Sequence, residues 1–504
     1  MQLLTLLAFA MLFWRGEQPG EWVLVPAGDV FWTMTAVLAP PVILGFSACA
    51  AMRIARRMLI ERPQTPEAAQ RFHHRAVLLL RVGTAVSFGV LVFLTHWPDW
   101  FLLGSITPAL QIVGDAIVLT PYLANLLVVW VATYPIERYV HQAGHAEASA
   151  ETTPTEEAGG LVDYLDFQIR HCFLVIACPM LLILFTSNMT RGHGPWLCEV
   201  TGWEWTPEVL LGVVAVGVFV LAPAMLRHIW RTTPLEPGPL RDRLEEACRR
   251  VGLRCRDILR WDSRGMMINA AVMGVVASLR FVLLSDALLA NMSSKQIEAA
   301  FGHEAGHIRH RHIQHFLVFA ALGWAAVAGV MELAAHALAD PEATGGSPLA
   351  AVEVVGVVAT VLVWGVGFGW LSRRFERQAD VFGARCVTPK PADCKVPCSV
   401  HPDAQTSLTT RGRVCASGAE IFVSALDRVA LLNGIPHEEP SWRHSSIGNR
   451  MRFLTSLAGD PNRAARFETS IRRTKRALIA LALASAALTA YYWITVPEPA
   501  IFQL

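Results

Sequence analysis

The sequence predicts a mainly α-helical membrane protein with several spans and a small cytosolic α+β domain that carries a β-sheet. Its 504 residues are 53% hydrophobic and only 17% charged, with a mean hydropathy of +0.39. Soluble proteins of this size are less apolar, so lipid is expected to surround part of the chain. A second observation is the stretch FGHEAGHIRHRH (301–312), which gathers histidines and one acid just before a long apolar run. The net charge of +2 gives no reason to expect nucleic acid as a partner.

Eight segments have the length and apolar content of a membrane-spanning helix, which needs about 20 residues. The opening residues 1–14 are also apolar but shorter, and they lack the basic start and small-residue cleavage site of a signal peptide. They are predicted to form a ninth span or an interfacial helix, which gives eight to nine spans. The eight segments are 30–52, 76–95, 106–133, 171–187, 207–226, 315–338, 350–371 and 476–496.

The distribution of arginine predicts how these spans are oriented. The loop 53–75 carries six arginines, whereas the next loop, 96–105, carries none. Because cytosolic loops are enriched in arginine and lysine, the first loop is predicted to be cytosolic. Alternation then places 227–314 and 372–475 on the cytosolic side as well.

Three regions follow from the spans. Residues 1–230 form an N-terminal transmembrane region, 231–474 form a domain interrupted by the transmembrane hairpin 315–371, and 475–504 form a last helix and tail. In the second region, 239–253 has the spacing of an amphipathic helix, and three short β-type runs lie within 257–285, which predicts a three-stranded sheet.

The helix that follows contains the histidine-rich stretch. Ser293 and Gln296 have the spacing of a capping box, so a helix is expected to begin there and to run without a break from about 294 into the span 315–338. On this helix His303 and His307 lie one turn apart on one face, with Glu304 beside them. This spacing lets two imidazoles bind one Zn²⁺ and leaves a carboxylate to act on the attacking water, as in zinc proteases. The alternative is a chance pattern in a histidine-rich helix end.

A catalytic zinc site needs a third protein ligand. In WLSRRFERQADVFGA (370–384), Glu376 and Asp380 lie four residues apart, and Glu376 would complete a His₂Glu site. The two ligand-bearing helices join the two spans of one hairpin and so start from the same membrane face. At 1.5 Å of rise per residue, His307 lies roughly 12 Å and Glu376 roughly 8 Å from the membrane boundary. The sequence therefore predicts one zinc ion at similar height on both helices.

With these motifs identified, the sequence resembles the gluzincin-type integral-membrane zinc metallopeptidases that include the HtpX heat-shock protease and the type I CaaX prenyl protease. The resemblance covers about 230–455, whereas the N-terminal half matches only as a set of spans. At 445, serine replaces the proline that usually follows histidine in the late motif. The resemblance rests on HEAGH (303–307), SRRFERQAD (372–380), NAAVMG (269–274), HSSIGNR (444–450) and His312 at the end of an HExGHxxxxH pattern.

The residues support a mechanism in which Glu304 takes the proton of a zinc-activated water and passes it to the leaving amine. Asp380 is expected to accept the other N–H of a ligand histidine, with an ordinary arginine pair as the alternative. The resemblance implies that His444 stabilises the oxyanion and that Asn269 and Ala270 hold the substrate as an added strand. A plain surface histidine remains the alternative for His444. Arg450 is expected to pair with an acid of the site or to serve structural pairing alone.

Other polar residues in apolar surroundings leave alternatives open. Asp115, inside a predicted span, is either functional or a buried hydrogen-bonded aspartate. No metal is assigned to His310, His312 and His315. Four cysteines fall in an apparent insertion, where they would bind a structural zinc, or form disulfides if the segment were outside the cell. These four are Cys386, Cys394, Cys398 and Cys415.

Three functions remain open. The leading prediction is a zinc metalloendopeptidase for misfolded or membrane-associated polypeptides in the bacterial inner membrane, acting in protein quality control from the cytosolic side. The scarcity of lysine, with only Lys295, Lys390, Lys395 and Lys475, favours a prokaryote. The alternatives are a CaaX-type processing peptidase of lipidated C-termini and a non-catalytic or signalling relative, against which the intact ligand set argues. The sequence does not predict an oligomeric state.

Overall fold

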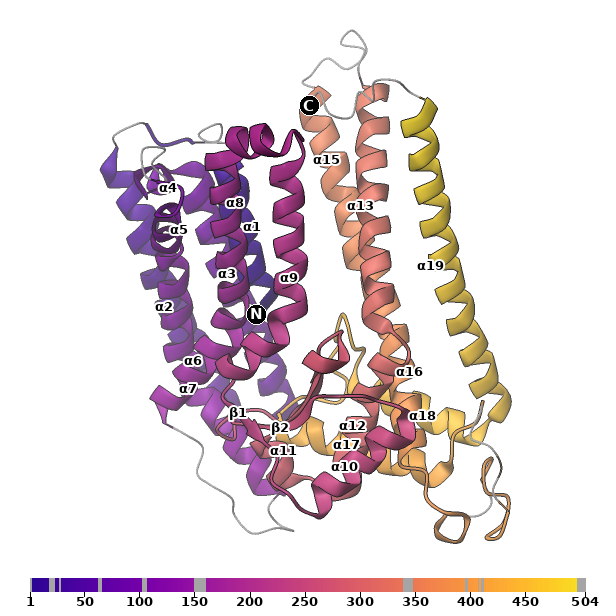
Figure 1. Cartoon of the computed structure of the whole chain (residues 1–504). Helices are drawn as coiled ribbons and strands as arrows, with labels where there is room; N and C mark the ends of the chain where they lie inside the picture. Colours follow the sequence, from indigo (N-terminus) through magenta and orange to yellow (C-terminus); the bar gives the residue numbers. More distant parts are fainter. Residues whose placement is uncertain are drawn as a thin grey trace. The chain divides into compact units, whose positions relative to one another are not determined.

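The computed structural model divides the chain into two compact units (Figure 1). Unit 1 comprises Met1–Glu236, Arg254–Asn291 and Val429–Pro436; unit 2 comprises Pro237–Leu253, Met292–Arg428 and His437–Leu504. The residues that the structure describes are 2–17, 23–26, 29–61, 66–101, 107–148, 160–338, 348–394, 398–406, 408 and 412–495.

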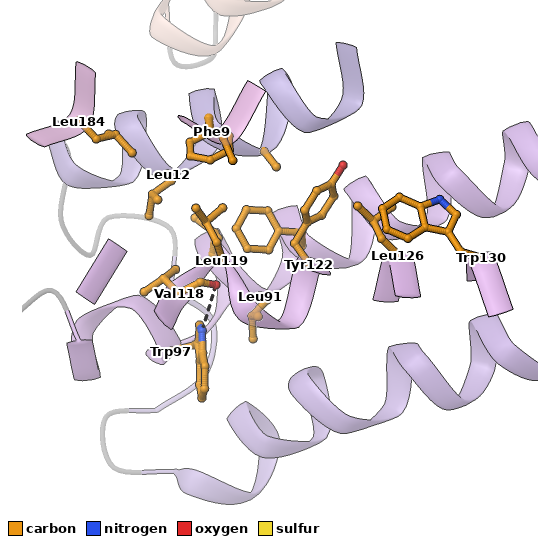
Figure 2. Packing of buried hydrophobic residues seen from close by; sticks show 14 of the residues in the cluster. Phe9, Leu12, Leu91, Trp97, Val118, Leu119, Tyr122, Leu126, Trp130 and Leu184 are labelled. Carbon is orange, nitrogen blue, oxygen red and sulfur yellow. Dashed lines mark hydrogen bonds between the residues drawn. The ribbon is translucent and has the colours of Figure 1, made fainter. Parts of the chain in front are cut away.

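Unit 1 is built mainly from long apolar helices. Their largest buried cluster contains Phe9 and Leu12 of the first helix, Leu91 of the third, and Tyr122 and Trp130 of the sixth (Figure 2). Burying aromatic side chains of this size stabilises the packing of these helices in addition to lipid contacts. The helices are α1 (Gln2–Glu17), α2 (Val30–Glu61), α3 (Pro66–Leu94), α4 (Trp97–Phe101), α5 (Gln111–Val118), α6 (Thr120–Ala148), α7 (Leu161–Gln168), η2 (Ile169–Leu174), α8 (Val175–Thr201), α9 (Thr206–Ile229) and the short α11 (Asp286–Asn291).

The intramembrane acid Asp115 has a hydrogen-bond partner within unit 1. It is 4% exposed, and Asn188 Nδ2 donates to its Oδ2 at 2.8 Å. A buried carboxylate with such a donor is satisfied without a ligand. The contact favours the hydrogen-bonded alternative over a functional role.

Seven helices in the described residues are long and apolar enough to cross a membrane, so the chain is a multi-pass membrane protein. Each corresponds to one of the first seven predicted spans. The eighth predicted span, 476–496, falls on α19 (Pro461–Thr495) and its last residue lies outside the described part, while the N-terminal Gln2–Gly16 is a shorter apolar helix. Eight or nine spans therefore stays a prediction. The predicted loops 53–75, 96–105 and 339–349 lie partly outside the described residues.

The small sheet belongs to unit 1 and has four strands in the order β1-β2-β4-β3. The prediction of three strands was wrong because β1, Thr232–Pro234, precedes the amphipathic helix and is too short and proline-containing to give a β pattern. It lies at an edge, antiparallel to β2 (Asp257–Trp261), which runs parallel to β4 (Phe281–Ser285). The other edge is β3 (Ala270–Met273), antiparallel to β4.

Unit 2 contains the two ligand-bearing helices and the helices that hold them. Among the membrane helices, α13 packs against α15 and α19, and Phe316, Leu371, Phe375 and Leu478 share one apolar cluster. The predicted capping box is confirmed: Ser293 Oγ accepts from Gln296 N–H, and Gln296 Oε1 accepts from Ser293 N–H. The elements are α10 (Pro239–Val251), α12 (Ser294–Arg309), α13 (His312–Ala337), α15 (Pro348–Thr360), η4 (Val361–Phe368), α16 (Gly369–Cys386), η5 (Pro391–Asp393), α17 (Ala416–Leu432, with its end assigned to unit 1), α18 (Ile447–Gly459) and α19.

The expected continuous helix from 294 into the span is wrong. The helix α12 ends at Arg309, Arg311 adopts a left-handed conformation with φ 55°, and α13 begins at His312. Lys475 Nζ donates to the carbonyl of His310 at 2.8 Å, so one carbonyl freed by the break keeps a partner. The break also turns the His312 ring onto Phe375, with ring centroids 4.3 Å apart. These tertiary contacts stabilise the break. The sequence has no proline or glycine at this point that would predict it.

Candidate metal centre

Small residues let the two ligand-bearing helices approach closely. A Cβ added at Gly306 of α12 would lie 3.1 Å from the Cα of Ala379 on α16, and one at Gly302 would lie 3.0 Å from the Cα of Gly383. Two helix backbones this close together leave room only for residues with small side chains, or none, at their contact. The motif residues between the glycines are therefore held directly against α16.

We predict that Gly383→Val removes the bound metal by separating the helices. The new Cβ would lie 2.9 Å from the His303 amide nitrogen and 3.0 Å from the Ala299 carbonyl oxygen, and backbone atoms cannot rotate away. Overpacking of this kind costs about 1–3 kcal/mol. Metal per chain and the melting temperature should both fall.

The control for this variant is Gly329→Val on α13, where an added Cβ meets nothing within 4 Å. It introduces the same side chain into a helix of the same unit without touching α16. Equal metal content in both variants would contradict the role of close packing at Gly383.

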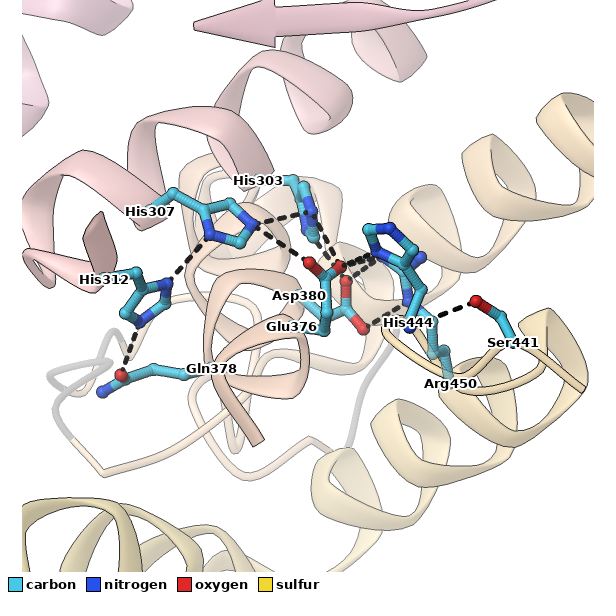
Figure 3. A network of polar contacts seen from close by, with 9 residues as sticks. All are labelled: His303, His307, His312, Glu376, Gln378, Asp380, Ser441, His444 and Arg450. Atoms are coloured by element: carbon cyan, nitrogen blue, oxygen red, sulfur yellow. Dashed lines mark hydrogen bonds and ion pairs between the residues drawn. The ribbon is translucent and has the colours of Figure 1, made fainter. Parts of the chain in front are cut away.

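Three predicted ligands converge in unit 2 (Figure 3). One ligand atom from each of His303, His307 and Glu376 lies within 4.8 Å of the other two. The two Nε2 atoms are 3.2 Å apart. Glu376 places Oε2 3.5 Å from His303 Nε2 and Oε1 3.6 Å from His307 Nε2. Two residues on successive turns of α12 and one residue of α16 thus direct three metal-binding atoms toward a common point.

These donor separations fit a small divalent cation. A tetrahedral zinc with bonds of 2.0–2.2 Å separates its nitrogen and oxygen ligands by roughly 3.3–3.6 Å. The observed separations of 3.5 and 3.6 Å fall in that range, and the third, 3.2 Å, lies just below it. Two imidazoles and one carboxylate are also the donor set of many catalytic zinc sites, which keep the fourth position open. The residues present therefore fit the metal that the sequence predicts.

Asp380 contacts His303 on the side that faces away from the other ligands, and Arg450 contacts Asp380. Asp380 Oδ1 lies 2.9 Å from His303 Nδ1, the nitrogen that faces away from the other ligands. Arg450 donates from Nε to Oδ2 at 2.9 Å and from Nη2 to Oδ1 at 2.5 Å. A bidentate guanidinium keeps this buried carboxylate ionised and fixes its plane, and the carboxylate in turn orients the imidazole. Both contacts predicted as alternatives for Asp380 are therefore present, because it contacts a ligand histidine and an arginine.

His444 contacts the third ligand. Its Nδ1 lies 3.0 Å from Glu376 Oε2, and its side chain is 48% exposed whereas that of Glu376 is 7% exposed. Ser445 follows with φ 67°, a left-handed conformation that proline, with φ fixed near −65°, cannot adopt. Proline at this position is therefore incompatible with the turn that precedes α18. Ser446 caps that helix by accepting from the Asn449 amide, which holds Arg450 one turn inside it.

The structure adds His312 and Gln378, which the sequence analysis did not assign to the site. His312 Nδ1 lies 2.9 Å from His307 Nδ1, and His312 Nε2 lies 2.9 Å from Gln378 Oε1. Since an amide oxygen can only accept, His312 carries its proton on Nε2, and its Nδ1 accepts from His307. This chain leaves His307 Nε2 unprotonated and free to bind a cation. The only sequence signal was the five-residue spacing from His307, which a continuous helix would not turn toward it.

Charges around the histidines favour a cation between them. Burial lowers the pKa of His303, but Asp380 and Glu376 raise it more, to about 10. Burial and the neighbouring His303 lower the pKa of His307 to about 3. Burial also opposes the charge on Arg450, yet Asp380, Glu376 and Glu304 raise its pKa overall. Two buried carboxylates thus attract positive charge while one imidazole stays neutral.

Glu304, Asn269 and Ala270 are the remaining predicted site residues. Glu304 follows His303 in α12, is partly buried, and is near enough to Arg450 to raise its pKa. Asn269 and Ala270 belong to unit 1, where exposed Asn269 donates its backbone N–H to Ser285 Oγ and its carbonyl accepts from the Ser285 N–H, just before the edge strand β3. Their role in substrate binding stays a prediction.

Comparison with known proteins agrees with this centre. Residues 234–457, which contain all three converging ligands, match the model of peptidase family M48. Over these residues the chain is similar to that family. It is 30% identical over 125 residues to CAAX prenyl protease 1 of Saccharomyces cerevisiae, a match that covers 24% of this chain and 28% of that protein. It thus spans little more than a quarter of this curated relative.

Among solved structures, the S. mikatae Ste24p crystal structure aligns with a TM-score of 0.48 and 15% identity, covering 85% of this chain and 99% of that one. Within the M48 match lie the break after α12, the glycine contacts and the cysteine-rich segment between α16 and α17. The match to peptidase family M48 implies a metal. The comparisons leave the substrate of this chain open.

Proposed function

We propose that the chain is a membrane-embedded zinc metalloendopeptidase that cleaves membrane-associated or misfolded polypeptides. The observation that carries the proposal is the convergence of His303, His307 and Glu376 with Glu304 adjacent on the same helix turn. Residues 231–474 would form the catalytic domain. The arginine-rich loop 53–75 supports a cytosolic active site, and the scarcity of lysine supports a bacterial inner membrane.

A zinc ion held by these three ligands would act as a Lewis acid on the scissile carbonyl and lower the pKa of a water. Glu304 takes the proton of the attacking water and delivers it to the leaving amine. Asp380 and His312 each face the Nδ1 of one histidine, which orients the Nε2 of that histidine toward the zinc position. His444, next to Glu376 and half exposed, is suited to donate a hydrogen bond to the developing oxyanion. Asn269 and Ala270 on the edge strand would pair with substrate backbone.

The test is metal-dependent cleavage by the full chain purified in detergent. We expect a chelator to abolish casein hydrolysis and added Zn²⁺ to restore it. Mg²⁺ should not restore it, because this hard cation prefers octahedral oxygen ligands over two imidazoles. Casein cleavage that persists at full rate after complete zinc removal would contradict the proposal.

Processing of lipidated C-termini is the second candidate, because the curated relative is named CAAX prenyl protease 1. The two functions differ in substrate. Cleavage of a prenylated C-terminal peptide at a higher kcat/KM than casein would favour processing, whereas indifference to the prenyl group would favour general endopeptidase activity. A protein that binds zinc and cleaves neither substrate would be the non-catalytic relative.

A further inference from the structure

The segment between α16 and α17 gathers four metal-binding side chains away from the candidate metal centre. Cys394, Cys398, His401 and Cys415 each bring one ligand atom within 4.8 Å of the others. The sequence predicts a shared site for the three cysteines and Cys386. The structure replaces Cys386 by His401, which lies three residues after Cys398 and was not recognised as a partner.

The separations within this cluster fit a tetrahedral site. Cys394 Sγ lies 3.5 Å from Cys398 Sγ and 3.3 Å from Cys415 Sγ. His401 Nδ1 lies 3.7 Å from Cys398 Sγ and 3.6 Å from Cys415 Sγ. Zinc with Zn–S bonds of 2.3 Å and Zn–N bonds of 2.0–2.1 Å separates its ligands by roughly 3.5–3.8 Å. The sulfur atoms are too far apart for a disulfide, whose S–S bond is about 2.05 Å.

The cluster is buried and its sulfur atoms receive hydrogen bonds. Cys394, His401 and Cys415 are 7%, 1% and 0% exposed. The His401 amide donates to Cys398 Sγ at 3.1 Å, and Ser417 Oγ donates to Cys394 Sγ at 3.5 Å. Donors aimed at sulfur stabilise thiolate, which is the form that binds metal.

The described chain around the cluster contains little regular structure. In the described part of 387–415, η5 is the only helix or strand. The apolar cluster there consists of Val400 and the three cysteines. A bound metal would stabilise a long segment whose described residues form so small a core.

We propose that Cys394, Cys398, His401 and Cys415 bind a second zinc ion that is structural. Three thiolates and one imidazole complete four-coordination, which leaves no position for water or substrate. Binding releases the thiol protons to solvent and gives a Zn(Cys)₃His group of net charge −1. Soft thiolate ligands select zinc over magnesium or calcium.

Such a zinc would fix the start of α17. Cys415 immediately precedes this helix, and Gly418 in its first turn lies against the Ala384 carbonyl of α16, where an added Cβ would be 2.6 Å away. One turn further, the Phe422 ring lies 6.1 Å from the His303 ring, measured between centroids. The structural site would thereby stabilise a helix that covers one side of the candidate metal centre. The proposal does not depend on peptidase activity.

The first test counts zinc in the full chain purified in detergent. We expect about two zinc ions per chain in the wild type and about one in the double variant Cys394→Ser, Cys415→Ser. His401→Ala should also lose one, and His401→Cys should regain it, because a fourth thiolate completes the site. Cys386→Ser is the matched control and should keep about two.

The second test uses cobalt to separate the sites. Replacing zinc with Co²⁺ should give thiolate-to-cobalt absorption in the wild type and in Glu376→Ala, but not in the Cys394, Cys415 double variant. If the double variant does not fold, loss of the absorption in folded His401→Ala and its recovery in His401→Cys still decide the matter. Wild-type protein with one zinc and no thiolate absorption, or with the mass of a Cys394–Cys415 disulfide, would overturn the proposal.

Discussion

Glu304→Gln is expected to reduce casein hydrolysis about 10²–10⁴-fold while the protein keeps its zinc. Glutamine has the size of glutamate but cannot take a proton from water near neutral pH. The ligands His303, His307 and Glu376 are unchanged, so metal affinity should remain. The loss should therefore appear in kcat, with zinc content and melting temperature close to those of the wild type.

A matched control for this change is Glu298→Gln on the same helix. Glu298 pairs with Arg250 at the surface side of α12, and loss of such a pair costs at most about 1 kcal/mol. Activity should stay within a few-fold of the wild type. Equal cleavage by wild type and Glu304→Gln would show that another residue is the base.

The sequence was sufficient where the structure depends on local spacing. His303 and His307, four residues apart on a capped helix, had to share a face, and Glu376 with Asp380 repeated that spacing on α16. The hairpin of two spans then accounts for the convergence of both helices. Asp380 beside His303 followed from the general need of ligand imidazoles for a hydrogen-bond acceptor.

The sequence was insufficient where distant residues decide the conformation. The left-handed Arg311 between α12 and α13 is compensated by Lys475 and Phe375, more than 60 residues away in the chain. Without that break, His312 could not be recognised as the partner of His307. His401 was missed for a similar reason, because a segment without regular structure gives no periodicity to show which side chains meet.

Glu376→Ala is expected to remove zinc from the candidate metal centre and to abolish hydrolysis. Two histidines alone leave two positions of a tetrahedral site without protein ligands. The affinity for zinc should therefore become too low for the ion to stay bound during purification. The substitution also leaves His444 and the buried guanidinium of Arg450 without one of the carboxylates that they face. With the structural site intact, total zinc should fall from about two to about one per chain.

The measurement is zinc per chain by mass spectrometry together with a melting curve. Glu332→Ala, at the far end of α13 where the side chain is 46% exposed, is the control for loss of a glutamate and should change neither value. Loss of activity alone would not identify a ligand, because an altered Arg450 or His444 would also impair catalysis. Zinc content separates these cases: Glu376→Ala protein that retains the wild-type amount in both sites would mean that a different residue is the third ligand.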